Sequence, residues 1–87
     1  MKLIFCPKCQ DMVKLLHDKR YCSCKASWGW YEKDGRNAVI GGEAIPIGID
    51  NSQFVPALKE ADDTKDRSHY FGAWVFGSLP DTIKREE

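Results

Sequence analysis

The sequence predicts a small mixed domain, mostly β, in which an N-terminal hairpin continues into an antiparallel sheet with one or two short helices. Short segments rich in β-branched and aromatic residues recur between turn residues, which is typical of closely spaced strands. Residues 21–31 alternate between two faces over an unusual length, which indicates one long strand. With 87 residues, the chain is expected to form a single domain, 1–87. A domain of this size often needs a disulfide or a bound metal to be stable.

The composition is that of an ordinary globular protein, with 43% hydrophobic and 30% charged residues. The net charge is zero, but residues 1–36 contain eight Lys/Arg against four Asp/Glu, a balance of +4. Residues 37–87 contain five against nine, a balance of −4. This polarised surface can orient a partner, and it lacks the overall basic excess of a protein that binds phosphates along its whole length.

The first residues do not form a targeting or membrane segment. Their apolar run ends after Leu3, Ile4 and Phe5, whereas a signal peptide needs about 7–15 apolar residues and a membrane helix about 20. We therefore expect no membrane association and a cytoplasmic, reducing location, where structural disulfides are rare.

Four cysteines occur in two close pairs, Cys6-Pro7-Lys8-Cys9 and Cys22-Ser23-Cys24, separated by twelve residues. A hairpin with its turn at 17–20 would bring the pairs together, and alternate residues of a strand point to the same side. Zinc requires four ligands in a tetrahedron, so the spacing predicts a structural Zn²⁺ held by Cys6, Cys9, Cys22 and Cys24. A site with four thiolates has no open position and is not catalytic.

Other interpretations of the cysteines remain open at this point. The same thiolates would also suit iron in a rubredoxin-like site. A redox-active Cys6/Cys9 pair and disulfide bonds are further alternatives. His17 and His69 are substitute ligands, although four cysteines already fill the coordination shell.

The segments "FCPKC" and "YCSC", with the gap between them, resemble the zinc-ribbon family of small metal domains. The resemblance covers about residues 3–26 and implies a ribbon hairpin there, followed by a β-rich remainder over 27–87. It implies the ligand role for the four cysteines and specifies no activity, because ribbons occur in many functional classes. The whole chain also resembles short, uncharacterised CPxC-type zinc proteins of bacteria and phages.

After the cysteines, the alternation over 21–31 places Trp28 and Trp30 on the same side as the thiolates, where the core is expected. Residues 32–36 predict a turn with Gly35 at positive φ, and 37–40 a second strand before the turn at 41–42. Residues 44–49 alternate three isoleucines with small residues, and Pro46 predicts an edge strand or a bulge.

The C-terminal half contains the helical signals. A short helix is predicted near 51–61, capped by Asp50 or Ser52, with Phe54, Val55 and Leu58 packing inward and Pro56 confined to the first turn. Residues 69–76 are apolar on both faces and predict a central strand. Residues 78–87 predict a short terminal helix.

The sequence contains no paired acid–base residues, nucleophile elbow or phosphate-binding loop, so we do not expect an enzyme. Elimination favours a protein-interaction or regulatory accessory module with a protein partner. The alternative is single-stranded DNA or RNA binding, in which basic groups lie beside aromatic side chains. The residues predicted for that role are Lys14, Lys19, Arg20, Tyr21, Lys25, Tyr31 and Lys33.

Overall fold

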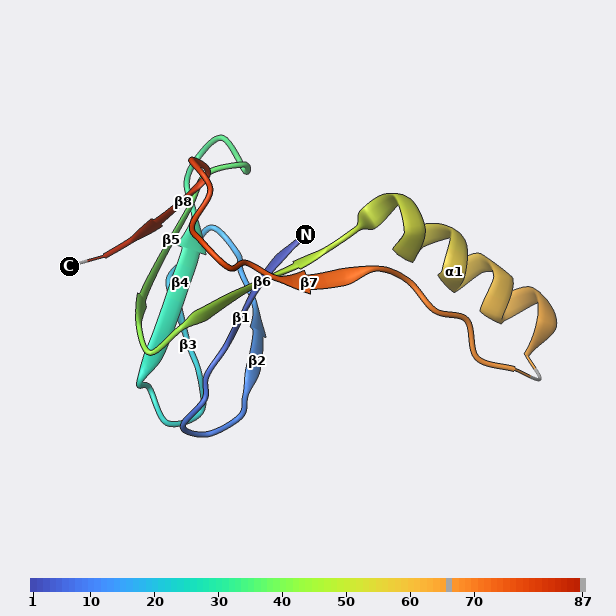
Figure 1. The fold of residues 1–87 in the computed structure, drawn as a ribbon, viewed down its shortest axis with the longest axis horizontal. Coiled ribbons are helices and arrows are strands. Elements are labelled where there is room, and N and C mark those ends of the chain that lie inside the picture. The colour runs from blue at the N-terminus through green and yellow to red at the C-terminus, as the bar shows by residue number, and fades with distance from the viewer. Residues whose placement is uncertain (66, 87) are drawn as a thin grey trace.

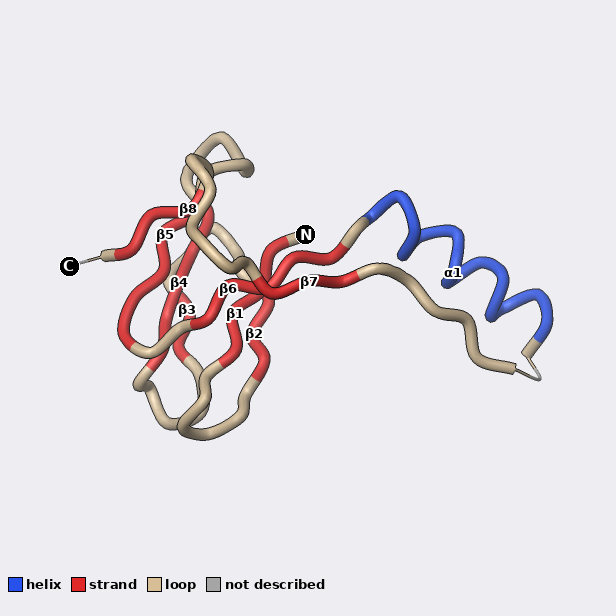
Figure 2. Tube along the Cα trace, viewed as in Figure 1, coloured by secondary structure: helices blue, strands red, loops and turns tan. Residues whose placement is uncertain are grey.

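A computed structural model describes residues 1–65 and 67–86 of the chain. Within these residues, eight strands and one helix form a mostly β fold, which confirms the predicted fold class (Figure 1, Figure 2). The elements are β1 Lys2–Phe5, β2 Met12–Lys14, β3 Arg20–Tyr21, β4 Ser27–Tyr31, β5 Ala38–Gly42, β6 Ile45–Ile49, α1 Asn51–Thr64, β7 Ala73–Val75 and β8 Ile83–Arg85.

The strands form two sheets instead of the single sheet that was expected. Sheet A has the order β2-β1-β6-β7 and is antiparallel throughout. Sheet B has the order β3-β4-β5-β8, in which β8 runs parallel to β5. The turn at 32–36 between β4 and β5 contains Gly35 at a φ of 69°, as predicted.

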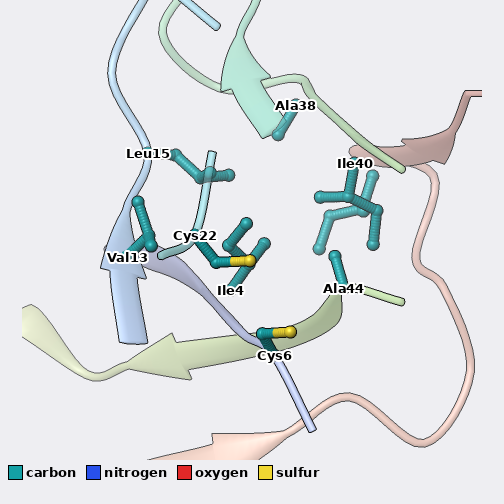
Figure 3. Close-up of a cluster of buried hydrophobic side chains, with 9 residues drawn as sticks. Ile4, Cys6, Val13, Leu15, Cys22, Ala38, Ile40 and Ala44 are labelled. Carbon is teal, nitrogen blue, oxygen red and sulfur yellow. The ribbon is translucent and has the colours of Figure 1, made fainter. Parts of the chain in front are cut away.

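The core lies between the two sheets (Figure 3). Ile4 of β1 and Ile40 of β5 are fully buried there, and Leu15 is almost fully buried. Cys6 and Cys22 belong to the same buried cluster, so the cysteine pairs adjoin the hydrophobic core. The hydroxyl of Tyr31 in β4 accepts a 2.8 Å hydrogen bond from the backbone N–H of Lys2 in β1 and thereby joins the two sheets.

The prediction that Pro46 marks an edge strand or a bulge was wrong, because β6 lies inside sheet A between β1 and β7 and its register with both is unbroken. Met1 and Ile49 exchange hydrogen bonds of 3.1 and 2.9 Å. Antiparallel pairs alternate, so Pro46 faces Ile4 in a pair that needs no N–H from the proline. The proline nitrogen, which carries no hydrogen, faces β7 instead. Strand β7 ends at Val75, and the N–H of the next residue, Phe76, still donates to the carbonyl of Pro46.

The segment expected to be a central strand, 69–76, was also predicted wrongly. Only Ala73–Val75 forms a strand, and it lies at the exposed edge of sheet A. The predicted terminal helix is replaced by strand β8, whose Ile83 enters the core, while Glu87 lies outside the described residues. Both segments are short, and their pairing partners, not their local propensity, decide their structure.

Helix α1 and the chain that returns from it, described over residues 50–65 and 67–72, form an arm that projects from the two sheets (Figure 1). The helix itself was predicted, and Asp50 caps it by accepting a hydrogen bond from the Ser52 N–H. Pro56 lies in the second turn and not the first. Val55 and Leu58 are exposed, contrary to prediction, since the arm extends away from the core and only Ala57 is buried.

Sheet A has an outward side that is largely apolar. Residues paired across neighbouring strands share a face, and the rows Leu3–Ile47–Val75 and Phe5–Ile45 point away from the core. The small residues that alternate with the isoleucines in β6 point inward and are buried. We call this surface the apolar face; it consists of Leu3, Phe5, Met12, Ile45, Ile47, Ile49 and Val75.

Candidate metal centre

The first cysteine pair lies in a tight turn between β1 and β2. The N–H of Gln10 donates to the carbonyl of Cys6 at 2.7 Å, and the N–H of Cys6 donates to the backbone carbonyl of Asp11 at 3.0 Å. Gln10 has a φ of 60°, the left-handed conformation that closes the turn. The turn begins at the buried Cys6 and carries Cys9 back beside it.

The second cysteine pair lies in a similar turn and not on a strand, which corrects the prediction of one strand over 21–31. The N–H of Lys25 donates to the carbonyl of Cys22 at 3.0 Å, and Lys25 has a φ of 64°. The N–H of Cys22 donates to the backbone carbonyl of Ser27, where β4 begins. This turn breaks the alternation, so the residues after it face the opposite side from the one predicted.

The two turns bring the four cysteines together. Their Sγ atoms all lie within 4.8 Å of one another, and this is the only such group of His, Cys, Asp or Glu among the described residues. The Sγ of Cys24 lies 3.7 Å from that of Cys6 and 3.6 Å from that of Cys22. All four cysteines are free thiols in the structure, so the cluster is arranged as a metal-binding group.

Asp11 holds the two turns against each other, a role that sequence analysis missed. Its carboxylate accepts hydrogen bonds from the N–H and the hydroxyl of Ser23, at 2.9 and 3.0 Å. Ser23 lies between the cysteines of the second pair, so the bond links one turn directly to the other. An acidic residue two positions after Cys9 was the only signal for this contact.

The histidines considered as substitute ligands lie elsewhere. The ring of His17 packs against Tyr31 with a centroid distance of 6.3 Å. His69 lies on the arm, where its ring nitrogens contact Glu60 at 3.3 Å and Thr64 at 2.9 Å. Neither histidine belongs to the cysteine group.

The surroundings of the thiols favour ionised sulfur on the buried side. The Ser27 hydroxyl, assisted by backbone groups of Cys9 and Lys8, outweighs burial and lowers the pKa of Cys6 to about 6. Burial opposes ionisation of Cys22, but the Ser27 N–H donates to its sulfur at 3.3 Å and the pKa of Cys22 is lowered. Metal-bound cysteine requires the thiolate, so both shifts prepare the site for a cation.

Cys24 behaves differently from the buried pair. The backbone of Ala26 lowers its pKa, but removal from water and hydrogen bonds with the other thiols outweigh that effect and raise the pKa of Cys24 to about 11. The cluster therefore tends to keep one proton on its exposed side, and a bound cation would displace it.

The residues predicted for nucleic-acid binding do not gather on one surface. Lys14 lies on β2, Arg20 donates to the Lys14 carbonyl at 2.9 Å, and Lys25 belongs to the second cysteine turn. Lys33 is exposed in the turn between β4 and β5, and Tyr31 is half-buried with its hydroxyl bonded to the Lys2 N–H.

Sheet B nevertheless presents an aromatic surface on its outer side. The prediction that Trp28 and Trp30 lie in the core was wrong, because Ser27 and Gly29 face inward and the tryptophans face outward, half-buried. The Nζ of Lys19 lies 5.4, 5.2 and 5.6 Å from the ring centroids of Tyr21, Trp28 and Trp30. These four residues form what we call the aromatic patch.

Comparison of the chain with protein-family models, with curated proteins and with solved structures finds no match. In the part of the chain that the structure describes, no helix combines the length and apolar character needed to cross a membrane. The site must therefore be interpreted from its own geometry, and that geometry identifies four cysteines within metal-binding distance in a small, mostly β domain.

Proposed function

We propose that the protein is a small, non-enzymatic interaction module whose fold is stapled by one structural Zn²⁺ on Cys6, Cys9, Cys22 and Cys24. The observation that carries the proposal is the arrangement of the sulfurs. A tetrahedron of sulfurs at the zinc–sulfur distance of about 2.3 Å has edges of about 3.8 Å. The two Sγ–Sγ distances of 3.6 and 3.7 Å fit those edges closely.

A second observation also fits a thiolate-bound cation. The hydroxyl of Ser27 is buried and has no hydrogen-bond partner among the described residues, although it lies near enough to Cys6 to lower the pKa of that thiol. Buried hydroxyl groups normally have a partner. A Cys6 thiolate that binds zinc would accept this hydrogen bond and leave no group unpaired, as partners of metal ligands commonly do.

The position of the ligands explains why the metal would be structural. One pair follows β1 of sheet A, and the other precedes β4 of sheet B. An ion on all four sulfurs ties the ends of the two sheets together beside the buried Ile4. Four thiolates leave no coordination position for a substrate, and the described residues enclose no pocket.

Metal analysis tests this proposal directly. We expect one zinc per chain, and we expect a strong chelator to unfold the two sheets, because binding energy at a structural site is folding energy. The variant Cys24→Ser should lose zinc at much lower chelator concentrations than the wild type. The matched control is Ser78→Ala, a change at an exposed position, which should keep its zinc as the wild type does. A protein that contains no zinc, or keeps its full fold when zinc is removed, would overturn the proposal.

Single-stranded nucleic acid is the second candidate partner, and the aromatic patch favours it. Three rings and an ammonium on one sheet surface match the stacking platforms that bind bases, each base contributing about 1–3 kcal/mol. The Trp74→Phe variant leaves Trp28 and Trp30 as the only indole reporters. Titration with oligonucleotides should quench their fluorescence, with affinity falling steeply as salt rises. No quenching at low salt would exclude this candidate.

A further inference from the structure

Two apolar surfaces of this chain have no covering layer within the described residues: the apolar face of sheet A and one side of helix α1. We propose that they cover each other between two copies of the chain, with the arm of each copy packed on the apolar face of the other. This inference deepens the interaction role proposed above by naming a second copy as the partner.

The free side of the helix is a short apolar ridge. Val55 and Leu58 are 61% and 55% exposed and lie about one turn apart, so their side chains are neighbours. The adjoining side of the helix is already occupied, since Phe54 packs on Phe71 of the returning chain with a centroid distance of 4.6 Å. The ridge therefore remains available for a contact outside the arm.

The dimensions of the two surfaces match. Helix α1 has 14 residues and is about 21 Å long. Four strands spaced about 4.8 Å apart make the apolar face about 14–19 Å wide. A helix laid on one face of a sheet is among the few stable ways to bury both.

Charge also favours this pairing. The four strands of sheet A contain two charged residues, Lys2 and Lys14, both positive. Residues 50–72 contain three basic residues against five acidic ones, a balance of −2. Asp62 follows Leu58 by one turn and therefore lies on the same side of the helix as the ridge. An arm with this charge is attracted to the apolar face and its Lys14.

The arm cannot reach its own apolar face without breaking its attachment to the sheets. The N–H of Asp50 donates to the Gly72 carbonyl at 2.9 Å, which fixes both ends of the arm together. From there the helix projects away from sheet A (Figure 1). A second copy related by a two-fold axis supplies both missing surfaces at once, and the contact occurs twice.

Molar-mass measurements on the full-length, zinc-loaded protein test the inference. We expect about twice the 9.9 kDa of the chain at micromolar concentrations. Leu58→Glu on the ridge and Val75→Glu on the apolar face, at a side chain 64% exposed, should each give monomers with unchanged zinc content. Gln53→Glu adds the same charge as Leu58→Glu at an exposed position on the opposite side of the helix, and should leave the dimer intact.

Mixing the two monomeric variants separates this arrangement from other dimers. The intact arm of the Val75→Glu chain can still pack on the intact face of the Leu58→Glu chain, so a mixed dimer should form. A dimer that Leu58→Glu disrupts and Val75→Glu does not, or a mixture that stays monomeric, would overturn the arm-on-face contact. A monomeric, zinc-bound wild type would overturn the inference and leave the zinc proposal standing. A dimer that contains no zinc would overturn the zinc proposal and leave the inference standing.

Discussion

At the scale of single residues, the thiols of the metal centre are not equivalent. Cys6 and Cys22 are buried at the edge of the core, whereas Cys24 is exposed. The pKa of Cys6 is lowered to about 6, and that of Cys24 is raised to about 11. Zinc binds thiolates in competition with protons, so these two residues should control different parts of the pH dependence.

We predict that the apparent zinc affinity falls as the pH is lowered from about 8 to about 5, and falls more steeply below about 6. Cys24 is protonated throughout this range and must release its proton when metal binds. Cys6 stays ionised until the pH falls through about 6, and below that it also takes up a proton that zinc must displace. Competition with a chelating dye measures the affinity, and calorimetry in different buffers counts the protons. An affinity independent of pH would contradict the prediction.

At the scale of elements, Gly41 of β5 permits the position of Trp28 on the outside of sheet B. A Cβ atom at Gly41 would lie 2.2 Å from Nε1 of the Trp28 ring, which therefore lies flat over the glycine. That nitrogen donates a 2.7 Å hydrogen bond to Glu86 beyond the end of β8. The space left by this one glycine thus allows the Trp28 ring to lie on the sheet and to bind the C-terminal chain there.

Gly41→Ala should destabilise the protein by about 1–3 kcal/mol, because the ring must leave its place and the bond to Glu86 is lost. Gly77→Ala is the matched control, since a Cβ there meets nothing within 4 Å and the backbone φ is not in the left-handed range. Urea unfolding of both variants gives the difference in free energy. Equal stability of the two variants would show that the Trp28 ring does not depend on Gly41.

The same elements show how far sequence reasoning reached. The cysteine spacing predicted the cluster, and the signals around Asp50 and Gly35 predicted the helix start and one hairpin turn. The side on which Trp28 and Trp30 lie was missed because Lys25 adopts a left-handed conformation, and a turn of that kind reverses every later assignment. No residue-type signal marks a lysine for that conformation.

The inward side of β6 was not predicted, for a different reason. Alternation identifies two faces but does not say which one is the core. Here the small residues of β6 are buried because neighbouring elements approach them closely. A Cβ atom at Gly48, for example, would lie 2.3 Å from the Trp74 ring. Bulky residues consequently point outward on the apolar face, a placement that only the tertiary structure reveals.

At the scale of the whole molecule, the body formed by the two sheets and the arm depend on different interactions. The body has its own core and the candidate metal centre, whereas Ala57 is the only buried residue among the described residues of the arm. Isolated helices shorter than about 12–15 residues are marginal in water, and α1 also contains Pro56. The arm should therefore owe its helical structure to whatever covers it.

If a second copy covers the arm, dilution should unfold the helix while the metal centre stays intact. We predict that the helical circular dichroism signal per residue falls as the protein is diluted through the dissociation range of the dimer. In the cobalt-substituted protein, the absorption of the thiolate-bound metal should not change over the same range, because the cysteines lie in the body. The monomeric Val75→Glu variant should show the reduced helical signal at every concentration, and Gln53→Glu should follow the wild type. A helical signal that does not depend on concentration in a protein that does dissociate would show that the arm is stable alone, and would remove the energetic reason for its docking.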